Sequence, residues 1–249
     1  MSERKNISNK IENFVDYFIK EQKIDLGDNP YKCAVLKAYD DVKRTMSGIG
    51  KMESQKKAVL DNISKKIKNY FSNVAPTSKG EFDNIHNRLC QVWIEGFKQD
   101  ENLACYGKAQ KIVNMTFKYL YCVMKKDKAE YFKFCHMPLD SYTLSFLKEI
   151  QDQKVISYET KWSNIKDIDE YKKIQEIADK WADKNQLTAL ESEFIIWNCL
   201  KVFKTSKEYF HLVLGFEQEM ASIFKIDDFS SEYFKENKLQ NYIEKVLNN

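Results

Sequence analysis

The chain has 249 residues, of which 43% are hydrophobic and 14% aromatic, so it can bury a substantial core, and a disordered chain is excluded. Only seven Gly and three Pro are present, too few for the tight turns of a sandwich or barrel. Forty Lys and Arg against 37 Asp and Glu leave a net charge of +3, which is compatible with nucleic-acid binding but does not require it. We therefore expect an all-α fold.

No apolar run reaches the roughly 18 residues needed to span a membrane, and the polar start MSERKNISNK lacks signal-peptide character. The six cysteines are scattered without a Cys-x-x-Cys pair. Buried, reduced thiols and no metal site are expected from this pattern. The prediction is a cytoplasmic protein.

Taken in chain order, apolar residues from Ile7 to Ile19 recur at helical spacing, and a second helix begins near Tyr31 after the break GDNP. SGIGK, at 47–51, is a turn. The lysine-rich helix that follows has its apolar stripe at Leu60, Ile63, Ile67 and Phe71. Its outer lysines indicate a solvated face, with a phosphate-contacting face as the alternative.

Ser78 and Glu81 form the pattern of a capping box, which predicts the start of the next helix. A central helix is predicted from about Lys108 to Met124, and another from near Asp140. The segment 154–162 loses the helical period and is expected to hold the one short extended piece. Further helices are predicted at 167–183, 189–204, 207–224 and 231–247, with a second capping box, Thr188 to Glu191, at the start of 189–204.

Lys111 and Asp140 are the candidate catalytic residues. Asp140, which follows Pro138 in MPLDSY and precedes an apolar-periodic run, taken alone predicts a helix N-cap. Lys111 lies near a helix start, where the dipole and apolar surroundings both disfavour the ammonium and make the nucleophilic amine more accessible. A carboxylate nearby can accept the ammonium proton and stabilise positive charge on a sugar losing its base. Together the two groups suit attack on C1′ of a nucleotide.

The stretches GKAQKIVNM (107–115) and MPLDSY (137–142) resemble the helix-hairpin-helix superfamily of DNA glycosylases, most of all its archaeal 8-oxoguanine glycosylase and AP lyase branch. The resemblance implies a two-lobed helical domain with a cleft, one lobe at about 78–138 and the other from the N-terminal helices plus 139–249. It also implies that Lys111 forms a Schiff base and that Asp140 assists it. Only Gly107 remains of the two glycines common in the hairpin.

Glu193 and Trp197 lie four residues apart in TALESEFIIWNCL, on one helix face. In the same branch an acidic residue and a tryptophan at this spacing line the base pocket, so Glu193 would accept hydrogen bonds from the base and Trp197 would stack on it. Met115 and Pro138 are assigned to the same substrate site. The alternative is a core tryptophan with a solvated glutamate.

Four residues are predicted to contact DNA: Gly107, Lys108, Gln110 and Lys51. Lys108 is also the rival nucleophile, one turn before Lys111. GIGK, at 48–51, resembles a glycine hairpin more closely, but no Pro-x-Asp follows it at a useful distance. Lys51 is therefore assigned to a turn or a phosphate contact.

The resemblance thus implies a monomeric DNA repair enzyme without a cofactor. It would act on double-stranded DNA, excise a damaged or modified base, 8-oxoguanine-like by resemblance, and cleave the strand by β-elimination. Two alternatives stay open: a modified base in foreign (phage) DNA as the substrate, and a non-catalytic helical module that binds nucleic acid or protein. Lys111 and Asp140 are expected to face each other across a cavity large enough for a nucleobase.

Overall fold

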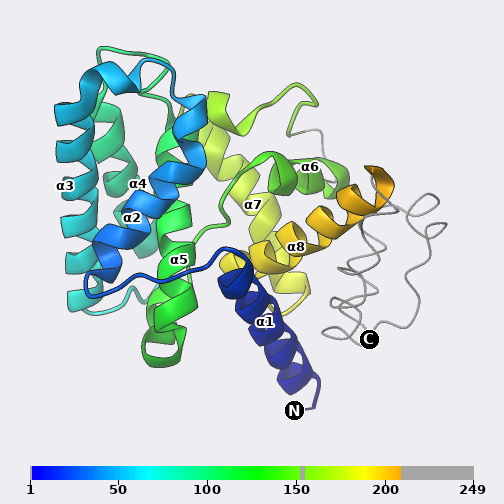
Figure 1. Ribbon diagram of the computed structural model, residues 1–249. Coiled ribbons are helices and arrows are strands. Elements are labelled where there is room, and N and C mark those ends of the chain that lie inside the picture. Colours follow the sequence, from blue (N-terminus) through cyan, green and yellow to red (C-terminus); the bar gives the residue numbers. More distant parts are fainter. Residues whose placement is uncertain (1, 152–154, 209–249) are drawn as a thin grey trace.

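The structure is a computed structural model that describes residues 2–151 and 155–208 (Figure 1). These residues form eight α-helices and three short 3-10 helices, with no strand among them. The all-α prediction is confirmed. The strand predicted at 154–162 is wrong for the described residues 155–162, which contain a bend at Ile156 and a turn at 158–159 and lead into the 3-10 helix η3 (Trp162–Asn164).

The first four helices are α1 (Ser2–Glu21), α2 (Pro30–Val42), α3 (Glu53–Ser72) and α4 (Lys79–Gly96). Two 3-10 helices, η1 (Lys43–Thr45) and η2 (Ile49–Met52), connect α2 to α3. The Asn29 side chain caps α2 ahead of Pro30, and the Ser78 side chain accepts from Glu81 N at the start of α4. Glu81 bonds to Thr77 rather than to the Ser78 backbone, so only half of that capping box forms.

The other four helices are α5 (Tyr106–Phe132), α6 (Ser141–Ile150), α7 (Ile168–Lys184) and α8 (Ala189–Glu208). Helix α5 continues past its predicted end at Met124 because Lys128, at a kink, bonds to Phe71 O and so ties the polar stretch to α3. The reciprocal capping box of Thr188 and Glu191 starts α8 as predicted. The predicted break after residue 204 is wrong because α8 continues to Glu208; the remainder of 207–224, and 231–247, lie outside the described residues.

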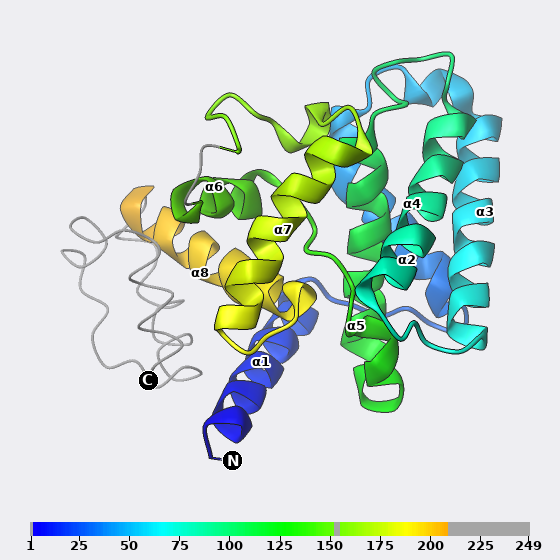
Figure 2. The ribbon, with the colours of Figure 1, turned by 180° about the vertical axis from the view of Figure 1, so that it is seen from behind.

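Helix α5 is the central element, and its residues 106–122 are buried. Helices α2 and α4 pack against it on the side where α3 covers both, while α1 and α7 contact it from the side that also holds α6 and α8 (Figures 1 and 2). Of the N-terminal helices, α2 and α3 pack in one group with α4 and α5, whereas α1 packs on α8. The division into two glycosylase lobes stays a prediction.

Within the described ranges, none of the helices combines the length and the apolar character needed to cross a bilayer.

Candidate functional site

Lys111 and Asp140 lie in direct contact. Lys111 Nζ donates to Asp140 Oδ2 at 3.0 Å, with side-chain exposures of 7% and 15%. Lys111 projects from the second turn of α5, and Asp140 immediately precedes α6. The expectation that the two groups face each other across a cavity is therefore replaced by an ion pair that lines a cavity together.

Asp140 uses its two oxygens for different tasks. Oδ1 accepts from the backbone N–H groups of Tyr142 and Thr143 and caps α6, while Thr143 Oγ1 accepts from Asp140 N in return. Oδ2 is left for Lys111. The cap and the ion pair, which the sequence presents as alternatives, are thus formed by one side chain.

Asp140 is held in its ionised form by its neighbours. Burial alone would raise its pKa, but the Lys111 ammonium and the Thr143 backbone N–H outweigh burial and hold the pKa below the ordinary value of 3.8. A carboxylate that is ionised at neutral pH and 3.0 Å from an ammonium is placed to accept its proton.

The segment that carries Asp140 is held by two glutamine side chains. Gln110 accepts from Leu139 N and donates to Leu139 O, and Gln175 of α7 does the same for Met137. Each amide therefore imitates one rung of a β-ladder and satisfies a buried backbone that has no strand partner. This clamp fixes the start of α6 relative to α5 and α7.

A cavity of about 280 Å³ lies beside the ion pair. Its lining includes five of the six predicted catalytic and substrate-binding residues: Lys111, Met115, Asp140, Glu193 and Trp197. These residues come from α5, from the start of α6 and from α8. The volume is close to the lower end of ligand cavities, roughly 300 Å³, which suits a single flat heterocycle.

Glu193 lies at the closed end of this cavity, with no exposed surface. Its Oε2 is 2.5 Å from Lys118 Nζ, while Oε1 has no hydrogen-bond partner within the described part of the chain. Burial raises the pKa of the Glu193 carboxyl, and the Lys118 ammonium acts in the opposite direction. A buried acceptor without a donor is costly, so Oε1 is available for an N–H or O–H group of a ligand.

Lys118 was not predicted, although it is the second ammonium of the site. It is 1% exposed, and its Nζ lies 3.8 Å from the centre of the Phe18 ring and 5.2 Å from that of Trp197. The aromatic faces and Glu193 together stabilise the buried charge. One signal was present in the sequence: Lys118 follows Lys111 by 118 − 111 = 7 residues, two helical turns along one face.

The aromatic lining of the cavity is wider than predicted. Trp197 was the one aromatic side chain assigned to it, and the structure adds Phe18, Tyr119, Tyr142 and Trp162. They come from four different elements, so periodicity within one helix could not group them. Flat side chains on several walls suit a flat ligand.

Pro138 is buried and does not line the cavity. Its carbonyl accepts from Thr143 Oγ1, so it supports the capped start of α6. The position of Pro138 therefore does not support a contact with substrate. It does support the predicted link to Asp140, through the start of α6.

Three of the four predicted DNA contacts lie in the interior. Gly107 N donates to Ile165 O, Lys108 Nζ binds Asn102, and Gln110 belongs to the clamp described above. Their polar groups already have protein partners, so the backbone-to-phosphate contact expected at Gly107 has no free N–H there. Lys51 is exposed, in η2. Lys108, the rival nucleophile, does not line the cavity.

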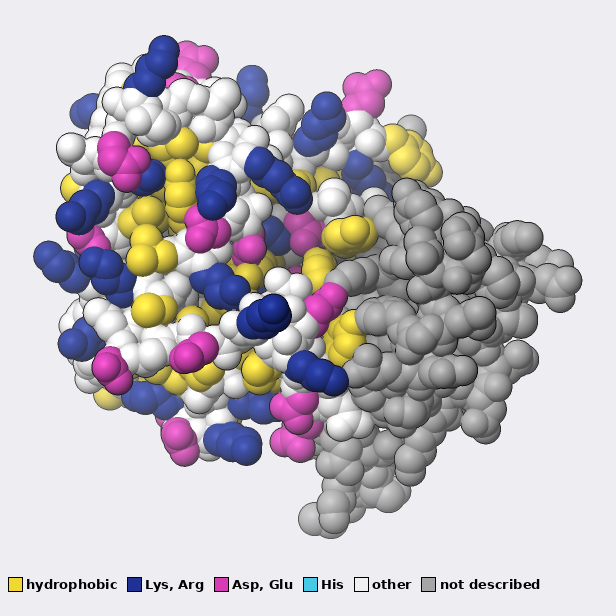
Figure 3. Space-filling model, viewed as in Figure 1, with side chains coloured by type: hydrophobic (Ala, Val, Ile, Leu, Met, Phe, Trp, Pro, Cys, Tyr) yellow, Lys and Arg dark blue, Asp and Glu magenta, His cyan; other side chains and the backbone are white. Residues whose placement is uncertain are grey.

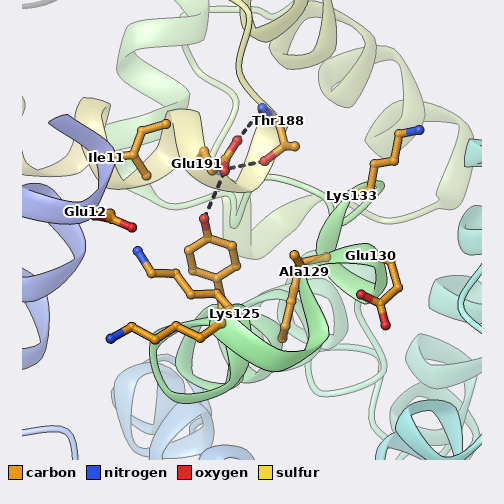
Figure 4. Close-up of a pocket in the computed structure, with 11 residues that line it drawn as sticks. Ile11, Glu12, Lys125, Ala129, Glu130, Lys133, Thr188 and Glu191 are labelled. Carbon is orange, nitrogen blue, oxygen red and sulfur yellow. Dashed lines mark hydrogen bonds between the residues drawn. The ribbon is translucent and has the colours of Figure 1, made fainter. Parts of the chain in front are cut away.

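A second cavity, of about 510 Å³, lies between α1, the C-terminal half of α5 and the start of α8 (Figure 4). It is larger, but its central carboxylate, Glu191, is occupied by Tyr121 and by the Thr188 cap. Lys125, Lys126 and Lys133 also line it. The smaller cavity is the better candidate because two ammonium–carboxylate pairs and several aromatic side chains meet there.

Charged side chains are mixed on the described part of the molecular surface. Figure 3 shows Lys and Arg interspersed with Asp and Glu over the face seen in Figure 1. A continuous basic patch is not visible there, in keeping with a net charge of only +3. Nucleic-acid binding to this face would depend on a few individual contacts.

Comparisons of the chain with protein-family models, with curated proteins and with solved structures find no match.

Proposed function

We propose that the protein is a DNA glycosylase with associated AP lyase activity, in which Lys111 is the nucleophile and Asp140 its proton acceptor. The observation that supports this most is the contact of a nearly buried amine with an ionised carboxylate at the wall of a base-sized cavity. An amine nucleophile needs such a base to become neutral, and the 3.0 Å separation is within hydrogen-bond reach.

In the proposed reaction, Asp140 takes a proton from the Lys111 ammonium. The amine lone pair forms a bond to C1′ of the target nucleotide while the C1′–N bond breaks, and the base leaves with the bonding electron pair and takes up a proton. The nitrogen then drives out the ring oxygen, which is protonated, and a protonated imine links Lys111 to the opened sugar. Asp140 passes the first proton to the leaving base and so regains its charge. It then takes a proton from the attached nitrogen, passes it to the ring oxygen, and as a carboxylate stabilises the positive charge of the imine.

The lyase step follows from the imine. A base removes a proton from C2′, and the electron pair forms a C1′=C2′ enamine. The enamine restores the C1′=N imine and forms a C2′=C3′ double bond as the C3′–O bond breaks, with the 3′ phosphate as the leaving group. Water then hydrolyses the imine and restores Lys111. No electrons are gained or lost overall, so the chemistry requires no redox partner.

The remaining walls suit recognition of the extruded base. Trp197 and Met115 supply flat or apolar surface, and Glu193 Oε1 can accept a hydrogen bond from a base N–H. Damaged guanine and a modified base in foreign DNA both present such donors.

Borohydride trapping on duplexes that carry candidate lesions tests the proposal, because borohydride reduces the imine to a stable amine. The wild-type protein is expected to form a covalent adduct, and Lys111→Gln is expected to form none. Lys126→Gln is the matched control, since this exposed lysine lines the other cavity. An adduct that persists in Lys111→Gln would show that another residue is the nucleophile, and Lys118 would be tested next.

Salt-sensitive DNA binding with no adduct on any lesion would favour the alternative function, a non-catalytic binding module.

A further inference from the structure

The charged side chains that line the candidate cavity are unequally satisfied. Lys111 pairs with Asp140 and Lys118 with Glu193. Asp41 Oδ2 accepts a hydrogen bond of 2.6 Å from Tyr119. Arg44 also lines the cavity, yet its guanidinium has no ion pair or hydrogen bond with any described residue.

Arg44 lies at the mouth of the cavity rather than at its closed end. Its side chain is exposed, whereas Lys118 and Glu193 at the other end are 1% and 0% exposed. Arg44 belongs to η1, which follows α2 and lies outside the α5–α6 region that holds the ion pair. A ligand that fills the cavity and extends outward would therefore meet the guanidinium where it leaves the protein.

The part of a nucleotide that stays outside the cavity is anionic. A flipped base enters the pocket while its two flanking phosphates remain in the DNA backbone. Each carboxylate of the lining has a partner within the lining. Arg44 is therefore the cation of the lining that has no carboxylate partner among the described residues. Guanidinium binds phosphate through two parallel hydrogen bonds, which also fixes its orientation.

We infer that Arg44 binds a phosphate directly flanking the nucleotide whose base occupies the cavity, and that it thereby positions C1′ at Lys111. The inference rests on the proposed function and extends it to the DNA backbone. Arg44 acts as a positioning residue, because it does not touch the reacting atoms. A phosphate contact carries no base information, so its loss affects all substrates alike.

The test uses the full-length protein and a duplex with a tetrahydrofuran abasic analogue, which keeps the sugar and phosphates but has no base. Arg44→Gln is expected to raise Kd about 10-fold at fixed salt and to lower the salt slope by about one phosphate. The matched control is Lys43→Gln, an adjacent exposed cation that is paired with Asp40 at 2.9 Å and does not line the cavity. Its Kd is expected to stay within about 2-fold.

A second arm identifies the phosphate. Methylphosphonate replaces, one at a time, each phosphate that flanks the abasic analogue. At one position the methylphosphonate is expected to weaken binding by the wild-type protein, whereas binding by Arg44→Gln is expected to be the same with and without it. Circular dichroism of both variants checks that they fold alike.

Three outcomes would overturn the inference. The first is Arg44→Gln binding like Lys43→Gln while the wild-type protein still traps with borohydride; in that case the proposed function stands and Arg44 has no such role. The second is a loss of affinity in Arg44→Gln that persists unchanged at every methylphosphonate position, which would mean that Arg44 does not contact a flanking phosphate. The third is a wild-type protein that neither binds nor traps any of the duplexes, which would remove the proposed function as well.

Discussion

Asp140 shows how one side chain can satisfy a structural and a chemical requirement together. One oxygen caps α6 and the other receives the Lys111 ammonium. Each task explains part of the environment: the cap fixes the carboxylate, and the ion pair keeps it charged against burial. A substitution that separates the two tasks is therefore informative.

Asp140→Asn is expected to impair catalysis far more than folding or binding. Asparagine caps helices about as well as aspartate, so α6 keeps its start, but the amide cannot accept the Lys111 proton. Single-turnover excision should slow by about 10²- to 10⁴-fold, while Kd for an abasic-analogue duplex changes only a few-fold. Asp140→Ala is the comparison, because it removes the cap too and should also lower the free energy of unfolding by about 1 kcal/mol. Equal rates in wild-type and Asp140→Asn proteins would contradict a role for this carboxylate.

Helix α5 is fixed at its start by a glycine. A Cβ built on Gly107 would lie 1.8 Å from the carbonyl oxygen of Trp162, which is backbone and cannot rotate away. This close approach joins α5 to η3, and Trp162 lines the candidate cavity. The glycine that was expected to approach a phosphate instead permits the approach of another backbone segment.

Gly107→Ala is therefore expected to lower the free energy of unfolding by about 3 kcal/mol, because the added methyl group overpacks the contact with η3. Gly80→Ala in the first turn of α4 is the matched control, since nothing lies within 4 Å of its added Cβ. A neutral or slightly stabilising change, up to about 1 kcal/mol, is expected there. Chemical denaturation of both variants measures the difference, and similar midpoints would show that the α5–η3 contact is not tight.

At the scale of the whole molecule, a buried polar network joins α4, α5 and α7. His136 bonds to Asp83 at 2.7 Å and to Tyr171 at 2.9 Å, and His86 bonds to Asn114 at 2.9 Å. Asn114 in turn donates to Tyr171, so the two histidines belong to one network. Burial lowers the pKa of both rings, well below 6.5 for His86, and for His136 Asp83 opposes this only in part.

The sign of the pH effect follows from these directions. Both rings stay neutral in the folded protein, whereas the unfolded chain takes up protons below a pKa of about 6.5, so stability falls as the pH drops through this value. Each histidine contributes a slope of up to about 1.4 kcal/mol per pH unit until its folded pKa is reached. Urea denaturation between pH 7.5 and 5.5 measures this slope, and His86→Gln should reduce it. An unchanged slope in that variant would mean that His86 does not titrate differently on unfolding.

Sequence periodicity predicts that the helices exist, because apolar residues recur at helical spacing, and it places helix starts where a side-chain cap is present, as at Ser78, Asp140 and Thr188. It misses the ends of α5 and α8, which no cap or glycine marks in the sequence. It cannot predict which helices meet, so Lys118, Phe18 and Arg44 were missed at the candidate site even though it was anchored on Lys111. The interior roles of Gly107, Lys108 and Gln110 were missed for a related reason. Their partners, Ile165, Asn102 and Leu139, lie on other segments, and nothing in a local pattern marks a polar side chain as already satisfied.

The two glutamine side chains of the clamp set the spacing between α5 and α7. Gln110 binds Leu139 from α5, and Gln175 binds Met137 from α7. If either helix slid along its axis, the segment 137–139 would have to stretch, or one glutamine would have to release its hydrogen bonds. The carboxylate at the end of that segment would move with it. Under the proposed function, alignment of the Lys111 amine with the Asp140 carboxylate is thus tied to how α5 and α7 pack. Packing changes far from the cavity are then expected to alter turnover without changing a residue that lines it.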